Sequence, residues 1–387
     1  MKKKRFDMQF QSKLPGVSVT IFTMMTRLAN EHGAINLSQG FPDFAPDAEL
    51  FDLVTRYMRE GNNQYAPMQG VMALRERISE KVSALYDATY SPVNEITVTS
   101  GGTEALYAAI TAVVHPGDEV IIFEPAYDSY VPAVELSGGK PVYCPLRFPG
   151  YSIDWDMVKD SITPKTRLMI LNSPHNPTGS VLSAEDMKAL IDIVANTRIL
   201  IVSDEVYEHI LFDGARHESM ARYPELAERS FVVSSFGKTF HTTGWKIGYC
   251  VAPADLTTEF QKVHQYLTFA SNTPMQCAFA AFMEKRERYT ALPDFYQAKR
   301  DHFLSLIRGS RFTFTPSKGT YFQMLDYSGI TDEPDADFVR RMTVEHGVAA
   351  IPPSVFYHDA VDNRVLRFCF AKKEVTLERA AERLCRI

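Results

Sequence analysis

Short apolar runs alternate with helical patterns through the middle of the chain. Strand-like runs occupy residues 95–99, 119–123, 141–144, 167–171, 198–203, 231–234 and 247–252, and an alanine-rich helical pattern at 104–114 follows the first of them. Several runs are continuously apolar and β-branched, as expected for strands that are covered by helices on both faces. The pattern predicts an α/β fold with a mainly parallel sheet of roughly seven strands.

The two ends of the chain have a different pattern. Amphipathic helical patterns at 296–307 and 377–384 accompany a few strand-like runs, such as 364–371. We therefore expect residues 45–285 to form a large ligand-binding domain. Residues 1–44 and 286–387 are expected to form a smaller α/β domain that packs against it.

Composition narrows the class of protein. The chain has 387 residues, of which 45% are apolar and 23% charged, and its formal charge of −6 gives no electrostatic footprint for nucleic acid. No apolar run reaches the length of a membrane span, and the basic start lacks the apolar region of a signal peptide. The five scattered cysteines show no metal-ligand spacing. We expect a cytoplasmic protein that binds no metal, membrane or nucleic acid.

Polar residues follow several predicted strands, where open α/β sheets bind ligands. Gly101, Gly102 and Thr103 form a glycine-rich turn before the helical pattern at 104–114. Such a turn can seat an anion with its backbone N–H groups, although it can equally be a plain tight turn. Tyr127 follows the next strand and could cover a flat ring, or could simply pack in the core.

Three further strand ends carry reactive or hydrogen-bonding groups. Asn176 lies in a turn that two X-Pro steps stiffen, and Asp204 ends an apolar strand, where a carboxylate needs a partner or caps a helix. Lys238 follows the strand at 231–234. A lysine there could be a solvated loop residue, but burial lowers a lysine pKa and would suit it to Schiff-base chemistry.

These features lie in chain order at successive strand ends. They comprise an anion seat, a ring cover, a fixed amide, a carboxylate, an amine and a tyrosine, Tyr207. Together they indicate a site for an aromatic, phosphorylated aldehyde with a ring nitrogen. Pyridoxal 5′-phosphate (PLP) has this chemistry.

Three of the motifs carry a family resemblance. Asn-Pro-Thr-Gly at 176–179, Asp-Glu-Val-Tyr at 204–207 and Ser-Phe-Gly-Lys at 235–238 resemble the class I/II aminotransferases, which have PLP fold type I. The likeness covers nearly the whole chain. Residues 36–44 and 64–67 are similar to the branch that contains kynurenine/glutamine transaminases and bacterial methionine aminotransferases.

The resemblance implies a role for each residue that faces the cofactor ring. Lys238 is expected to hold PLP as a Schiff base and, once released, to carry a proton. Asp204 is expected to pair with the pyridine nitrogen and keep it protonated. Tyr207 and Asn176 are expected to bind the phenolic oxygen, and Tyr127 to stack on the ring.

The resemblance also implies which groups hold the phosphate. The expected set is Gly101, Gly102, Thr103 and Ser235. Tyr65 is expected to reach the phosphate of a neighbouring subunit, which implies a homodimer with shared sites. Where many family members have an arginine, this chain has Lys246, which supplies a point charge without a bidentate fork.

For the substrate, the resemblance implies that Arg367 grips the α-carboxylate, assisted by Gly40 and Asn176. Dicarboxylate-specific relatives carry a second arginine, whose place here falls near Leu267. This predicts an apolar or aromatic side-chain pocket. Its expected lining is Phe22, Tyr65 and Phe356.

The expected reaction is ping-pong transfer of an amino group from an L-amino acid to a 2-oxo acid. Methionine, phenylalanine, tyrosine and kynurenine are the expected donors. A PLP-dependent C–S β-lyase or a cyclopropane-forming synthase could use the same cofactor site. A non-enzymatic PLP-sensing domain of a transcription regulator is disfavoured, because only about forty residues precede Gly40.

Overall fold

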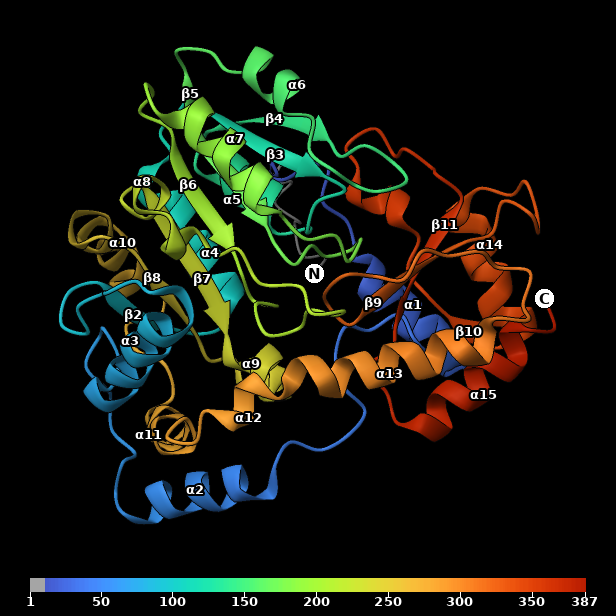
Figure 1. The fold of residues 1–387 in the computed structure, drawn as a ribbon, viewed down its shortest axis with the longest axis horizontal. Coiled ribbons are helices and arrows are strands. Elements are labelled where there is room, and N and C mark those ends of the chain that lie inside the picture. The colour runs from blue at the N-terminus through green and yellow to red at the C-terminus, as the bar shows by residue number, and fades with distance from the viewer. Residues whose placement is uncertain (1–10) are drawn as a thin grey trace, which may run out of the picture.

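A seven-stranded sheet forms the centre of the larger part of the molecule (Figure 1), in a computed structural model that describes residues 11–387. Its order is β2-β8-β7-β6-β5-β3-β4, and only β8 runs antiparallel to its neighbours. The strands are β2 (Ile96–Thr99), β3 (Glu119–Glu124), β4 (Lys140–Pro145), β5 (Thr166–Asn172), β6 (Leu200–Asp204), β7 (Ser230–Ser235) and β8 (Gly248–Val251). Each overlaps one predicted strand, so the predicted mainly parallel α/β sheet is confirmed.

Both faces of the sheet are covered, which explains the continuous apolar strands. On β3, Val120 and Ile122 belong to one hydrophobic core, while Ile121 and Phe123 belong to the other. Successive side chains of a strand point to opposite faces, so each strand must be apolar throughout. One core includes α4 (Gly102–Val113), α5 (Tyr130–Leu136) and α10 (Ala254–Leu267). The other includes α3 (Met72–Tyr86), α6 (Trp155–Asp160), α7 (Ala184–Val194) and α8 (Pro224–Ala227).

The N-terminal segment joins the C-terminal part of the chain. It contributes α1 (Ile21–Glu31) and β1 (Ile35–Asn36), and β1 pairs in parallel with β10 (Val348–Ala349). β11 (Val365–Cys369) pairs antiparallel with β9 (Phe322–Asp326), while α13 (Leu292–Ile307) packs on α15 (Glu374–Leu384). Both predicted C-terminal helices are present, and each begins a few residues earlier than the amphipathic pattern indicated.

The remaining α-helices lie outside these groups. They are α2 (Ala48–Arg59), which packs on α11 (Thr273–Phe282), α9 (Phe236–Thr239), which follows β7, α12 (Glu287–Thr290), which contacts α13, and α14 (Asp335–Arg341), which lies near β11. The β1–β10 pairing supports a division into residues 45–285 and 1–44 with 286–387, which we retain as a proposal. Residues 1–10 of the smaller part lie outside the described residues.

No helix among residues 11–387 combines the length and apolar character that crossing a bilayer requires. The chemistry-bearing residues lie instead at one edge of the sheet. Strands β3, β5, β6 and β7 are parallel, so their carboxyl ends meet at this edge.

Candidate active site

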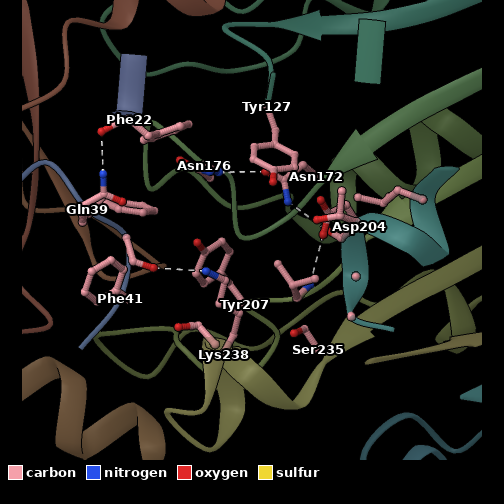
Figure 2. A pocket seen from close by; sticks show the side chains of 18 of the residues that line it. Phe22, Gln39, Phe41, Tyr127, Asn172, Asn176, Asp204, Tyr207, Ser235 and Lys238 are labelled. Carbon is pink, nitrogen blue, oxygen red and sulfur yellow. Dashed lines mark hydrogen bonds between the residues drawn. The ribbon is translucent and has the colours of Figure 1, made fainter. Parts of the chain in front are cut away.

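A cavity of about 280 Å³ lies at the carboxyl edge of the sheet, between it and the segments around Gly40 and β11 (Figure 2). Every site residue predicted from the sequence lines this cavity except Tyr65 and Phe356. Those residues are Phe22, Gly40, Gly101, Gly102, Thr103, Tyr127, Asn176, Asp204, Tyr207, Ser235, Lys238, Lys246 and Arg367. The structure thus brings together, from distant parts of the chain, groups that the sequence could only place at separate strand ends.

Lys238 lies on the short helix α9, directly after β7. Its Nζ donates hydrogen bonds to the Tyr321 hydroxyl at 3.0 Å and to the Gly40 carbonyl at 3.2 Å. Burial lowers the pKa of Lys238 to about 8, because a buried ammonium loses hydration. A usable fraction of neutral amine is therefore present near neutral pH, as attack on a carbonyl requires.

Asp204 is the last residue of β6 and is buried. Its Oδ2 accepts a hydrogen bond from the Tyr130 hydroxyl at 2.6 Å, and its Oδ1 accepts a long one, 3.3 Å, from the Val206 N–H. Burial raises the pKa of Asp204 to about 6 despite these contacts. A cation placed in the cavity beside Asp204 would stabilise the ionised carboxylate.

The N-terminus of α4 is the predicted anion seat. Gly101 has a φ of +82°, and a Cβ at Gly248 would come within 2.9 Å of backbone atoms of Gly101 and Gly102, so both close contacts need glycine. Lys246 lies against this turn, because a Cβ at Gly101 would be 3.4 Å from its Nζ. Free N–H groups, the helix dipole and this ammonium favour an anion here.

Arg367 forms the opposite wall, on β11. Its Nη1 donates to Asn176 Oδ1 at 2.7 Å and its Nη2 donates to the Ser38 carbonyl at 2.9 Å, while its guanidinium carbon lies 4.0 Å from the centre of the Phe322 ring. Within residues 11–387 its buried Nε has no hydrogen-bond partner. Burial lowers the pKa of Arg367 to about 10, so the group is still a cation at neutral pH. It is suited to receive a carboxylate.

The donor set fits PLP. An amine that becomes neutral near pH 8 suits the aldehyde, a buried carboxylate short of partners suits a protonated pyridine nitrogen, and a helix N-terminus with a lysine suits the phosphate. Figure 2 shows Tyr127 and Asp204 facing the same cavity as Tyr207 and Lys238. The burial and chemistry of these lining residues suit a flat, charged ring compound.

Sequence reasoning missed several residues that support the site. Tyr130 binds Asp204 from α5, and Asn172 Nδ2 donates to the Asp204 carbonyl at 2.8 Å. Tyr321 contacts Lys238, and Phe322 lies under Arg367. Tyr130 lies close to Tyr127 in sequence and their rings meet edge-on, with centroids 5.7 Å apart. The other contacts come from elements far away in sequence and had no local signal.

Tyr65 is 85% exposed in this single chain and does not line the cavity. Its ring meets the ring of Phe269 edge-on, with centroids 5.7 Å apart. Its predicted contact with a neighbouring subunit stays a prediction.

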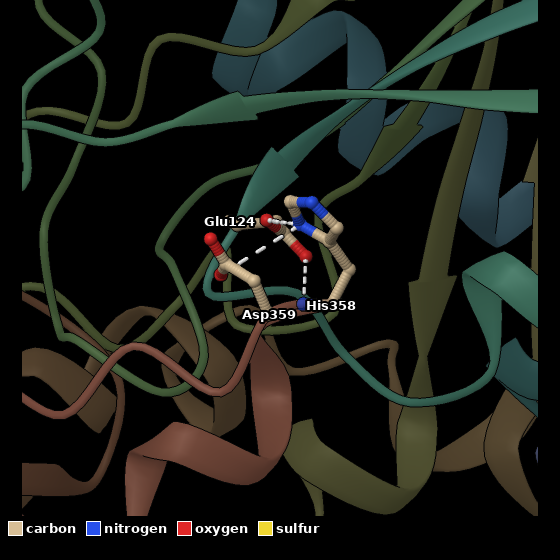
Figure 3. A group of neighbouring side chains, drawn as sticks. All are labelled: Glu124, His358 and Asp359. Carbon is tan, nitrogen blue, oxygen red and sulfur yellow. Dashed lines mark hydrogen bonds and ion pairs between the residues drawn. The ribbon is translucent and has the colours of Figure 1, made fainter.

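Glu124, His358 and Asp359 form a further polar cluster near the end of β3 (Figure 3). The three are close enough to share an ion, but His358 already occupies both oxygens of Glu124, with its N–H at 2.7 Å and its Nδ1 at 2.8 Å. The Ala126 N–H also donates to the Phe356 carbonyl at 2.8 Å. We interpret the cluster as a structural contact that holds the short helix ending at Phe356 against the segment that leads to Tyr127.

Comparison with known proteins agrees with this geometry. The family described as aminotransferase class I and II matches residues 32–384. The chain therefore belongs to the class I and II aminotransferases, which depend on PLP, and its fold is PLP fold type I. The sensor-domain alternative is thereby wrong, since the chain is an enzyme of this family.

Individual relatives within this family are similar to the chain over almost its full length. The methionine aminotransferase of Escherichia coli K12 is 52% identical, with 97% of each chain covered. A solved structure of E. coli YbdL, described as having a methionine aminotransferase function, superimposes with a TM-score of 0.96 at 51% identity, covering 98% of this chain and 100% of that one. A probable N-succinyldiaminopimelate aminotransferase of Mycobacterium tuberculosis is 37% identical, covering 96% of this chain and 97% of that one.

Proposed function

We propose that this aminotransferase takes the amino group from an apolar, sulfur-containing or aromatic L-amino acid, with methionine as the leading donor, and passes it to a 2-oxo acid. One observation supports this most directly. Among the described residues that line the cavity, Arg367 is the only cation outside the groups assigned to the cofactor, and the aromatic rings of Phe22, Phe322 and Phe356 lie around it. The likeness to methionine aminotransferase supports the same choice.

In this proposal Arg367 binds the α-carboxylate. The unpartnered Nε and the planar guanidinium offer a fork, and the partners Asn176 and Ser38 fix its orientation. A single cation fits a monocarboxylate, whereas a second carboxylate on the side chain would lie among aromatic rings without a partner. Phe22 and Phe356, whose ring centres are 6.1 Å apart, lie beside Arg367 and are the proposed apolar contacts.

Lys238 is proposed as the catalytic amine. PLP, when bound, supplies the electron sink that stabilises negative charge at the substrate α-carbon. Lys238 would hold the cofactor through its aldehyde carbon and, as the free amine, would take the proton from the substrate α-carbon and return it to the cofactor's former aldehyde carbon. A pKa of about 8 suits both tasks, because the amine must alternate between neutral and charged forms near neutral pH.

The remaining contacts orient the cofactor. Asp204 is proposed to hold a proton on the ring nitrogen by charge pairing, and Tyr207 and Asn176 to hydrogen-bond the ring oxygen. Tyr127 is proposed to cover one ring face. Lys246 and the start of α4 are proposed to hold the phosphate. The phosphate set further includes Gly101, Gly102, Thr103 and Ser235.

We also propose a homodimer in which Tyr65 completes the neighbouring site. Tyr65 and Tyr266 are each 85% exposed, and Leu267 and Phe269 nearby are also exposed. Such a group of large apolar side chains is costly on a free surface and is typical of an interface. The five free cysteines support a reducing cytoplasm as the location.

The donor assignment is tested by a panel of amino acids offered without any acceptor. We expect L-methionine to release one equivalent of 2-oxo acid per site and then stop, because a ping-pong enzyme needs an acceptor to continue. L-Aspartate is expected to react far more slowly. Continued release of pyruvate and thiol from cystathionine would instead favour the β-lyase.

A further inference from the structure

Tyr321 joins three parts of the chain at the active site. It lies immediately before β9, is fully buried, and accepts a hydrogen bond from Lys238 Nζ at 3.0 Å. Its own hydroxyl donates to the Gly40 carbonyl at 2.5 Å. The C-terminal part of the chain thereby contacts both the amine at the end of β7 and the N-terminal segment.

The direction of these bonds defines what Tyr321 can do. A phenol has one hydrogen, and Gly40 accepts it, so the oxygen presents a lone pair to Lys238. Burial, followed by the neighbouring Tyr207, raises the pKa of Tyr321 well above its usual value. Tyr321 therefore stays a neutral phenol at all working pH values and accepts a hydrogen bond without exchanging a proton.

The segment around Gly40 is fixed against the same ring. A Cβ at Gly40 would meet Phe322 at 2.7 Å and Tyr321 at 3.7 Å, so this backbone packs directly on both side chains. The Gly40 carbonyl also accepts from Lys238 at 3.2 Å. Lys238 Nζ, the Tyr321 oxygen and the Gly40 carbonyl thus form a closed triangle of hydrogen bonds.

We propose that Tyr321 is a positioning residue, which holds the free Lys238 amine in one place while the amine carries protons. This inference rests on the proposed role of Lys238. A lysine side chain has four rotatable bonds, and an amine released from a covalent link would otherwise sample many positions. The Tyr321 oxygen and the Gly40 carbonyl restrict it to the cavity wall. Tyr321 gains and loses no proton in the reaction.

The neighbouring Tyr296 offers a matched control. It is also fully buried, its ring centre lies 5.7 Å from that of Tyr321, and its hydroxyl has no hydrogen-bond partner within residues 11–387. Tyr321→Phe and Tyr296→Phe each remove one buried oxygen from the same aromatic cluster. Only the first removes a contact with Lys238.

The test has one measurement on the apoenzyme and one on the holoenzyme. The pH dependence of PLP capture by the apoenzyme gives the apparent pKa of Lys238. Tyr321→Phe is expected to lower it by about half a unit to one unit, because the ammonium loses an acceptor. The single-turnover rate with α-deuterated methionine is expected to fall about tenfold with a larger isotope effect, because the loss is in proton transfer.

Tyr296→Phe is expected to change neither quantity, and both variants should keep the melting temperature within a few degrees. Equal changes in the two variants, or an unchanged Lys238 pKa and isotope effect in Tyr321→Phe, would overturn the inference. The Lys238→Ala variant distinguishes a failure of the role of Tyr321 from a failure of the proposed function. If Lys238→Ala abolishes turnover while Tyr321→Phe has no effect, only the role of Tyr321 fails, whereas an active Lys238→Ala enzyme contradicts the proposed function itself.

Discussion

Two buried carboxylates, Asp204 at the end of β6 and Glu208 four residues later, have opposite surroundings. Glu208 faces a closed polar cluster, where it accepts hydrogen bonds from Lys81 at 2.5 Å, Ser234 at 2.5 Å and Tyr249 at 3.1 Å, and from Tyr86. Burial pushes the pKa of Glu208 upward, but Lys81 and the hydroxyl donors hold it well below its usual value. Glu208 is a fully partnered structural charge.

Asp204 faces the cavity, and within residues 11–387 its carboxylate accepts hydrogen bonds only from Tyr130 and, at long range, from the Val206 N–H. Burial therefore prevails and raises its pKa to about 6. The comparison teaches that a buried charge with a complete set of partners stabilises the fold, whereas one left short of partners is available to a ligand. The predictions below test this distinction.

The largest effect is expected for Asp204. Asp204→Ala should lower kcat by about 10³-fold, because the charge that stabilises the ring proton is lost. The melting temperature of the apoenzyme should stay the same or rise, since a poorly partnered buried charge has been removed. Steady-state kinetics and thermal unfolding measure the two quantities. A near-normal rate would contradict the assignment of Asp204.

Substitution of Glu208, in contrast, should lower the stability of the fold. Glu208→Gln leaves Lys81 buried without a counter-charge and should lower the free energy of unfolding by about 3–5 kcal/mol. Denaturant unfolding of the apoenzyme measures this loss. The double variant Lys81→Met/Glu208→Leu is the control and should regain most of it. A loss below about 1 kcal/mol in Glu208→Gln would place Glu208 in the same class as an exposed ion pair.

The stability of the apoenzyme should depend on pH differently in wild type and in the Asp204→Asn variant. The folded pKa of about 6 is above the usual 3.8, so the protonated form stabilises the fold fully below 3.8, and this stabilisation is lost as the pH rises through 6. From pH 4 to pH 7, wild type should lose about 2 kcal/mol relative to Asp204→Asn. Parallel stability curves for the two proteins would show that Asp204 has an ordinary pKa.

The smallest effect is expected for Lys246, whose ammonium lies against the predicted anion seat at Gly101. Lys246→Arg should tighten PLP binding by about three- to fivefold, because a guanidinium can bind phosphate through two parallel hydrogen bonds. Lys246→Met should weaken binding. Equilibrium dialysis of PLP against the apoenzyme compares them. Equal affinity of the Arg and Met variants would remove Lys246 from the phosphate site.

The sequence predicted those parts of the site that depend on local order. The ends of β5, β6 and β7 could be found from apolar runs, and parallel strands place Asn176, Asp204 and Lys238 at one edge. The turn at Gly101 and Gly102 was similarly visible, because a glycine pair before a helix is a local signal.

The partners of those residues could not be found from local order. Tyr321 meets Lys238 across 83 residues of chain, and Lys81 meets Glu208 across 127. No periodicity indicates which buried charge receives a complete set of partners, because that depends on how distant elements pack. The distinction between Asp204 and Glu208 is therefore a property of the fold.

The central claim is that Lys238 carries the cofactor. Purified holoenzyme can be reduced with borohydride, digested and sequenced by mass spectrometry, with untreated enzyme as the control. We predict one phosphopyridoxyl group per chain, on Lys238 alone. Absence of the group, or its attachment to Lys246 or any other lysine, would contradict the account.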